Sequence, residues 1–356
     1  MWKKVLAEWF GVLLSPLRLV TSRMTESETH TSTGQNELSG RKGTASSLRL
    51  IVLEPRGFCA GVRMAIEALE EALRRFGPPV YVYHEIVHNR AVVESFRQQG
   101  VIFVNDLEKV PPGSILLYSA HGVSPEIRRQ AAERRLRTID ATCPLVMKVH
   151  RRARELAEQG FKIILIGHPG HEEIVGTIGE APEAIHLVSS AEDVEQLNLP
   201  ESSKLAYLTQ TTLSLEDVRA ITAKLRERYP NIVGPPEGDL CYATQNRQEA
   251  VRAIAREVDV VLVVGSPNSS NSRRLMEIAR GLGTPAYLID SAAEIDRRWV
   301  ASARAVALTA GASAPEKLVQ ECVLVFVQEF GATVESRRFC EENVRFALPR
   351  ELRQSL

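Results

Sequence analysis

The sequence predicts an α/β protein with mainly parallel sheets, and two observations lead to this fold class. From residue 48 onward, short apolar runs rich in β-branched residues alternate with helical patterns. A loop of polar or small residues separates each apolar run from the helix that follows it. Strands that alternate with helices in this way form parallel sheets that are covered on both faces.

The expected elements follow one another regularly along the chain. In the first half, we expect strands over 48–53, 80–83, 114–118 and 138–139. Helical patterns follow them over 62–76, from about residue 90, after Pro125, and up to Gly160. The second half repeats the pattern with strands over 162–166, 204–208, 258–264 and 305–308. Because ligands of open α/β sheets bind beyond the carboxyl ends of strands, the loops mark the candidate site.

Three cysteines divide this pattern into modules. Cys59, Cys143 and Cys241 each lie in a loop after a strand, and their spacing is about that of a small α/β module. We therefore expect three similar modules between a leader and a C-terminal tail that packs back on the core. The expected boundaries are 1–47 for the leader, 48–142, 143–240 and 241–335 for the modules, and 336–356 for the tail.

The setting of these three thiols favours a metal site over a place in the core. Free cysteine is usually buried as a small hydrophobe, which fits Cys322 in its apolar run, and Cys340 lies in a polar tail without evident partners. The other three lie in approachable loops, where thiolates could hold an iron–sulfur cluster with one iron left open for a substrate. A zinc site with three cysteines and a histidine is the alternative.

Composition limits the classes of function and the compartment. The chain has 356 residues, with 44 Lys and Arg against 44 Asp and Glu, so no global charge attracts nucleic acid. Five scattered cysteines are too few for a disulfide framework, which predicts reduced thiols and a cytoplasmic protein. No apolar run reaches the roughly 20 residues of a spanning helix, so we expect no stable membrane insertion.

The leader over residues 1–47 is excluded from the fold prediction. Its first 20 residues carry early lysines and an apolar stretch that Glu8, Pro16 and Arg18 interrupt, without a small-x-small cleavage site. An amphipathic helix, a misassigned start before Met24 and a transit peptide all remain open. Residues 24–47 are rich in Ser, Thr, Glu and Gly, which is typical of disorder.

Loop histidines and an adjacent pair of carboxylates suggest anion binding and proton supply. His88, His121 and His171 lie in three separate loops, and imidazoles can donate hydrogen bonds to phosphate oxygens. Glu172 and Glu173 follow His171 directly. A glutamate near a buried anion can be held protonated as a general acid, whereas glutamate is also simply favoured in a first helical turn.

Clusters of hydroxyl and amide side chains follow three other strands. They cap helices or, together, bind one oxyanion, since helix N-termini offer free N–H groups without needing a net basic charge. Neither a dinucleotide fingerprint nor a Walker motif is present. The clusters consist of Thr211 and Thr212, of Ser269, Ser270 and Asn271, and of Ser313.

Taken together, these loops resemble those of the 4-hydroxy-3-methylbut-2-enyl diphosphate reductases of the methylerythritol phosphate route to isoprenoids. The resemblance covers roughly residues 48–353 in uninterrupted order, and only the leader departs from it. The motifs that carry it are PRGFCAGV (55–62), HEIVHN (84–89), SAHGVSP (119–125), DATCPLV (140–146), GHPGHEE (167–173), TQTTLS (209–214), CYATQNRQ (241–248), GSPNSSNS (265–272) and EENVRFALP (341–349).

The resemblance implies three α/β modules placed pseudo-threefold around one 4Fe–4S cluster per chain, with Cys59, Cys143 and Cys241 as ligands. The open iron would bind the allylic hydroxyl, His171 would lie near it, and Glu173 would supply the proton. Thr211 would position the hydroxyl, assisted by Thr212. The diphosphate would be bound by His88, His121, Ser269, Ser270, Asn271 and Ser313.

The reaction implied is reductive removal of the hydroxyl with two electrons and two protons, giving isopentenyl and dimethylallyl diphosphates. A ferredoxin or flavodoxin is the expected electron donor, and the chain would act as a monomer or homodimer. From the residues alone, two other classes stay open. The cysteines could serve a non-catalytic metal or redox sensor, or the Ser-rich loops alone could serve a phosphosugar isomerase.

Overall fold

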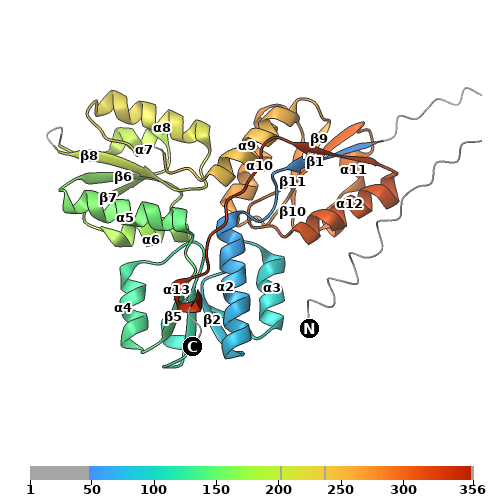
Figure 1. The fold of residues 1–356 in the computed structure, drawn as a ribbon. Helices are drawn as coiled ribbons and strands as arrows, with labels where there is room; N and C mark the ends of the chain where they lie inside the picture. The colour runs from blue at the N-terminus through green and yellow to red at the C-terminus, as the bar shows by residue number, and fades with distance from the viewer. Residues whose placement is uncertain (1–47, 201–202, 236–237, 354–356) are drawn as a thin grey trace, which may run out of the picture. The chain divides into compact units, whose positions relative to one another are not determined.

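The computed structural model describes residues 48–200, 203–235 and 238–353. The predictions for the leader fall outside these residues. Within them, twelve β-strands form three separate sheets, and every strand pairing is parallel. Figure 1 shows the sheets as three lobes flanked by helices, in agreement with the predicted α/β class. No helix in this part of the chain is long and apolar enough to cross a membrane.

The first and second sheets come from the first two thirds of the chain. Most of their strands are short and apolar, as parallel strands buried on both faces must be, whereas the edge strand β5 (Arg137–Asp140) has the more polar sequence RTID. The first sheet has the order β3 (Val101–Val104), β2 (Val80–Tyr83), β4 (Ile115–Tyr118) and β5 (Arg137–Asp140). The second has the order β7 (Ile185–Val188), β6 (Lys162–Ile166) and β8 (Leu205–Thr209).

The third sheet joins the two ends of the chain. Its central strand is β11 (Ala305–Ala310), with the sequence AVALTA, in which every residue is buried. Its order is β10 (Ala286–Ile289), β9 (Val260–Val264), β11 (Ala305–Ala310), β1 (Arg49–Glu54) and β12 (Thr333–Arg338).

The position of β1 corrects the expectation that residues 48–142 form one module with their own sheet. The strand is hydrogen-bonded between β11 and β12 in the third sheet. Leu50 and Val52 pack into the core on one face of this sheet, and Ile51 and Leu53 into the core on the other. A strand whose two faces are both apolar needs a central position, and β11 and β12 provide it.

Helices cover the sheets and begin at the loops that follow the strands. They are α2 (Ala60–Phe76), α3 (Arg90–Gln98), α4 (Pro125–Glu133), α5 (Pro144–Glu158), α6 (Glu172–Glu180), α7 (Ala191–Gln196), α8 (Leu215–Arg228), α9 (Tyr242–Ala255), α10 (Ser270–Gly281), α11 (Arg297–Val300), α12 (Glu316–Phe330) and α13 (Arg350–Arg353). Short 3₁₀ turns lie at Leu107–Lys109 and Ala292–Glu294. Cys322 is fully buried in α12, as its apolar surroundings predict.

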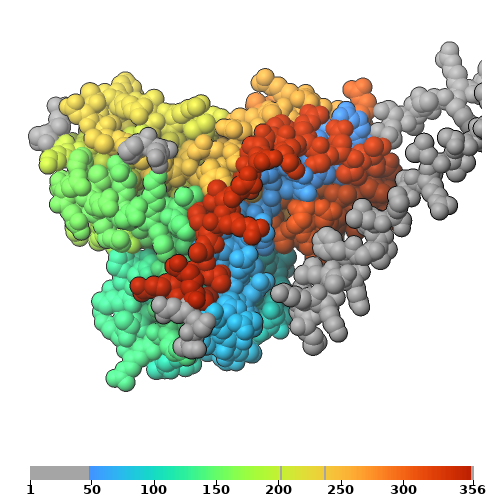
Figure 2. All heavy atoms as spheres, in the orientation of Figure 1, coloured from blue at the N-terminus to red at the C-terminus, as the bar shows by residue number. Residues whose placement is uncertain are grey.

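The residues after β12 return across the molecule to the first sheet. Leu352 of α13 is 1% exposed and packs in the core that α2 shares with this sheet. Arg75 of α2 donates a hydrogen bond of 2.5 Å to the carbonyl of Leu352. Figure 2 shows this segment, in red, lying over the blue and green parts of the chain. The tail therefore contacts parts of the chain that lie far from it in sequence.

Candidate functional site

One pocket collects every residue that the sequence singled out for binding or catalysis. Its cavity volume is about 100 Å³. Five helices, α2, α5, α6, α9 and α10, begin at its wall. The predicted residues that line it are Cys59, His88, His121, Cys143, His171, Glu173, Thr211, Thr212, Cys241, Ser269, Ser270, Asn271 and Ser313.

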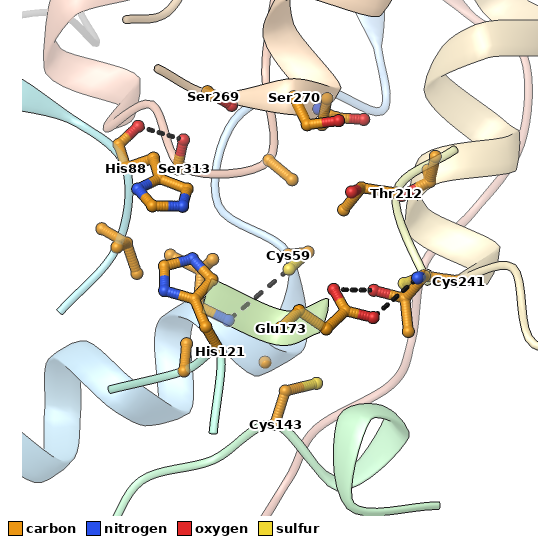
Figure 3. A pocket seen from close by; sticks show the side chains of 18 of the residues that line it. Cys59, His88, His121, Cys143, Glu173, Thr212, Cys241, Ser269, Ser270 and Ser313 are labelled. Atoms are coloured by element: carbon orange, nitrogen blue, oxygen red, sulfur yellow. Dashed lines mark hydrogen bonds between the residues drawn. The ribbon is translucent and has the colours of Figure 1, made fainter. Parts of the chain in front are cut away.

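The three loop cysteines occupy equivalent places, each as the N-cap residue of a helix. Cys59 precedes α2, Cys143 precedes α5 and Cys241 precedes α9. The Cys59 sulfur accepts a 3.5 Å hydrogen bond from the backbone N–H of Val62 (Figure 3). The free N–H groups and the partial positive charge of a helix N-terminus stabilise a thiolate. The fold therefore places all three sulfurs at helix N-termini, and among them only the Cys59 sulfur accepts a capping hydrogen bond.

Burial nevertheless makes these thiols reluctant to ionise without a cation. Burial raises the pKa of Cys143 to about 12, the neighbouring Cys59 adds to this rise, and nearby backbone N–H groups oppose it. Burial likewise raises the pKa of Cys241 to about 11, again with a contribution from Cys59. A metal centre would remove this penalty, because thiolates are its ligands.

The three sulfurs do not lie close enough together to surround a single ion. In a tetrahedral zinc site, Zn–S bonds of about 2.3 Å bring the sulfurs to roughly 3.8 Å from one another. Within the described part of the chain, the groups whose ligand atoms all lie within 4.8 Å of one another do not include the three cysteines. The cysteines thus converge on one pocket without closing on one ion, as an iron–sulfur cluster requires.

A glycine allows the first two cysteine loops to come together. Gly61 lies in the first turn of α2, beside Cys143. A Cβ atom at this position would lie 2.5 Å from the Cys143 sulfur and 3.2 Å from its Cβ. Any larger residue would displace the thiol, so the close approach requires glycine here.

The three histidines form a compact group beside the cysteines. The rings of His88 and His121 stack at 4.0 Å between centroids, and the His171 ring meets both edge-on, at 5.4 Å and 5.9 Å. Burial and the neighbouring imidazoles lower the pKa of His171 to about 3. Burial and His121 also lower the pKa of His88. His88 and His171 are therefore neutral at pH 7 until a negative ligand enters.

Two carboxylates lie beside these imidazoles: Glu172, which the sequence marked only as one of a pair of candidate acids, and Glu85, for which the sequence predicted no role. Glu172 Oε2 lies 2.8 Å from Nδ1 of His121, and Glu85 Oε2 lies 3.6 Å from Nδ1 of His88. Burial would raise the pKa of Glu172, but the hydrogen bond and charge of His121 outweigh it and bring the pKa to about 2. A carboxylate at Nδ1 holds the proton there, so that Nε2 of His121 faces a ligand and donates to it only when the ring is protonated. The adjacency of Glu172 to His171 was the only sequence signal for this contact.

Glu173 is buried against Thr211, and Figure 3 shows it between His121 and Cys241. The residue is 2% exposed. One carboxylate oxygen accepts a 2.7 Å hydrogen bond from the Thr211 N–H, and the other accepts a 3.0 Å hydrogen bond from the Thr211 hydroxyl. Burial raises the pKa of Glu173 to about 7, although the two hydrogen bonds from Thr211 oppose the rise. A carboxyl with this pKa carries a proton at neutral pH and can release it, which is what a general acid needs.

Hydroxyl and amide groups complete the wall at the start of α10. The Ser269 hydroxyl caps the helix by accepting 3.2 Å from the N–H of Ser272, and Ser270 and Asn271 form its first turn. Asn271 is 4% exposed, and neither its amide nitrogen nor its amide oxygen has a protein partner. A buried amide without partners costs free energy, so a polar ligand is the expected partner. Ser313 donates 2.8 Å to the backbone carbonyl of His88.

Comparison with known proteins places the chain in a family. Residues 50–326 match the LytB protein family. The chain is 52% identical over 306 residues to "4-hydroxy-3-methylbut-2-enyl diphosphate reductase" of Rhodopirellula baltica, covering 86% of this chain and 96% of that protein. The protein of the same name from Azoarcus sp. (strain BH72) is also 52% identical over 306 residues, covering 86% and 98%.

Solved structures agree with this result. The E-1-hydroxy-2-methyl-but-2-enyl-4-diphosphate reductase of Plasmodium falciparum superposes with a TM-score of 0.84 at 42% identity, over 86% of this chain and 97% of that one. A second structure, of (E)-4-hydroxy-3-methyl-but-2-enyl diphosphate reductase, gives a TM-score of 0.59 at 30% identity, over 79% and 99%. The family match, the sequence identities and the shared fold lead to one conclusion: the chain belongs to the LytB protein family.

Proposed function

We propose that this chain is an oxidoreductase that converts (E)-4-hydroxy-3-methylbut-2-enyl diphosphate to isopentenyl and dimethylallyl diphosphates. In this reaction a C–O bond breaks, a C–H bond forms, and two electrons and two protons enter as water leaves. The observation that supports this proposal is that three helix-capping cysteines, a group of histidines and a buried glutamate with a raised pKa line one pocket. The names of the relatives support the same reaction.

Cys59, Cys143 and Cys241 are the residues that would hold a cofactor, one 4Fe–4S cluster per chain. When bound there, the cluster supplies the electrons for the reduction. The three cysteines support this assignment by their equivalent N-cap positions and by their spacing.

The diphosphate is bound by the imidazoles and by the polar groups at the N-terminus of α10. His88 and His121 face the pocket beside Ser313, and Ser269, Ser270 and Asn271 surround the N-terminus of α10. A helix N-terminus and imidazoles bind phosphate oxygens through N–H groups, and the partial positive charge of the helix adds to the attraction. The binding of a negative ligand raises the pKa of the histidines, so the enzyme takes up protons with its substrate.

Glu173, which Thr211 holds in place, delivers the proton. The Thr211 N–H and hydroxyl fix both carboxylate oxygens, and burial keeps the proton on at neutral pH. His171 accepts a 3.2 Å hydrogen bond at Nδ1 from the N–H of Glu173, which leaves its Nε2–H for the ligand. In this arrangement Thr211, with Thr212 beside it, positions the substrate hydroxyl next to the acid.

The absence of a nucleotide-binding motif from the sequence leads to the proposed electron donor. Since no nucleotide-binding motif is present, the electrons come from a separate one-electron carrier of the ferredoxin or flavodoxin type. Two electrons then arrive in two encounters.

The test is metal analysis followed by turnover. Protein purified without oxygen should contain iron and acid-labile sulfide near the composition of one 4Fe–4S cluster per chain. With reduced methyl viologen as donor, it should form both five-carbon diphosphates, which mass spectrometry can quantify. Cys143→Ser should lose iron and turnover together. Zinc in place of iron would support a sensor, and turnover by Cys143→Ser would support a hydroxyl-loop isomerase.

A further inference from the structure

Arg247 is a charged residue that is completely buried. It lies in α9, two turns after Cys241, and is 0% exposed. Arginine is almost never fully buried unless it is paired, because removing a charge from water costs several kcal/mol. Neither the substrate nor the proposed proton path uses this side chain. Its position close to two cysteine ligands therefore needs another explanation.

The guanidinium of Arg247 joins three segments that lie far apart in the sequence. Nη1 donates 2.8 Å to the Ala243 carbonyl, two residues after Cys241. Nη2 donates 2.8 Å to the Gly57 carbonyl, two residues before Cys59. Both nitrogens also donate to Glu342 of the C-terminal tail, at 2.9 Å and 3.3 Å. One rigid cation thus contacts the loop that carries Cys59, the first turn of the helix that Cys241 caps, and the C-terminal tail.

The tail is itself held so that Glu342 reaches this position. Phe339 donates 2.8 Å to the carbonyl of Glu54, which extends the pairing of β12 with β1 by one residue. Asn246, next to Arg247 in α9, donates 3.0 Å to Glu342 Oε1. The carboxylate therefore receives hydrogen bonds from two adjacent residues of the helix that Cys241 caps. Its side chain is 14% exposed, so solvent screens the pair only weakly.

We propose that Arg247 and Glu342 are positioning residues for the cysteine ligands, and this rests on the proposed cluster. Arg247 fixes the distance between the loops of Cys59 and Cys241 through two backbone carbonyls. Glu342 neutralises the guanidinium, so that the cluster does not face an unpaired buried cation. Groups that orient ligands in this way govern metal retention and redox potential without touching the substrate.

The decisive variant is Glu342→Gln, which removes the charge and keeps the shape. In anaerobically purified holoenzyme, iron and sulfide content, bleaching of the visible spectrum in air, and the midpoint potential are measured. The variant should lose its cluster about 10-fold faster than the wild type, as other changes beside metal ligands do. Its midpoint potential should rise, because the unbalanced Arg247 cation favours the reduced, more negative cluster. Glu341→Gln is the matched control, since Glu341 is the adjacent residue and is 67% exposed.

A second variant separates geometry from charge. Arg247→Lys keeps the cation but cannot reach both carbonyls and the carboxylate, because an ammonium lacks the planar fork. It should accelerate cluster loss while moving the potential less than Glu342→Gln does. If both variants retain the cluster at wild-type rate and potential, the positioning role is refuted while the proposed function stands. A wild-type chain without iron or sulfide would instead overturn the proposed function and this inference together.

Discussion

Replacement of Glu173 by glutamine tests the proposed acid most directly. A glutamine fills the same volume but has no acidic proton, and its NH₂ group would face one of the two Thr211 donors. Loss of a general acid lowers the rate by about 10²–10⁴-fold. We expect kcat to fall by that factor while substrate still binds. In the wild type, activity should decline as the pH rises through about 7, because the carboxyl then loses its proton.

The same substitution should have an opposite effect on stability, and the size follows from the pKa. Burial raises the pKa of Glu173 from 4.5 to about 7 in the folded protein. The folded state thus binds a proton that the unfolded state has already released, and stability falls as the pH rises from 4.5 to 7. At about 1.4 kcal/mol per pKa unit, the ionised carboxyl costs about 3 kcal/mol above pH 7. Glutamine does not ionise and avoids this pH-dependent cost.

The assay compares anaerobic thermal unfolding of wild type and Glu173→Gln between pH 5 and pH 8, beside steady-state turnover. Glu183→Gln serves as control, because it removes an exposed carboxylate from the segment just after α6. The unfolding temperature of Glu173→Gln relative to wild type should increase with pH, and that of the control should not. A variant that keeps wild-type turnover, or a pH-independent difference in stability, would refute the reasoning about Glu173.

Three further outcomes follow from the geometry of the pocket. Gly61→Ala should lower the iron content, since its Cβ would lie 2.5 Å from the Cys143 sulfur; wild-type iron would show that the loop can shift freely. Diphosphate binding should take up protons at pH 7 and weaken as the pH rises, because His88 and His171 have lowered pKa values in the empty pocket; calorimetry in buffers of different ionisation enthalpy measures this. Asn271→Ala should weaken substrate binding by about 1–3 kcal/mol, measured by titration, with the cluster retained; unchanged affinity would leave the buried amide without a ligand role.

Local patterns predicted eight of the twelve strands that the structure describes and the loops that bear the site, and the four strands that were missed, β3, β7, β10 and β12, all lie at sheet edges. The run Val260–Val264 is apolar throughout, and this alone identifies a strand buried on both faces. Ser269 predicts the start of α10, because a serine before a helix favours the N-cap position. Since all the sheets are parallel, their loops at the carboxyl ends gather chemically active side chains in predictable places. The residues lining the pocket could therefore be named in advance.

Non-local pairing could not be predicted in the same way. Arg49–Glu54 is an apolar strand like the others, and nothing within it names β11 and β12 as its neighbours. Thr333–Arg338 was missed because an edge strand exposed to solvent lacks the apolar run that reveals buried strands. The pair of Arg247 and Glu342 joins residues 95 positions apart, and both look like ordinary surface charges in the sequence.

Electrostatics explains how a chain without net charge would hold the proposed diphosphate and three thiolates in one pocket. The helix N-termini supply partial positive charge that needs no counterion and does not titrate. The histidines become cationic only as the anion arrives, so the empty pocket avoids repulsion among the stacked rings of His88 and His121. Glu173 stays protonated because the same burial that suppresses those cations also suppresses its anion. One physical cause, the burial of these side chains, thus lowers the pKa of the histidines that would bind the substrate and raises the pKa of the carboxyl that would protonate it.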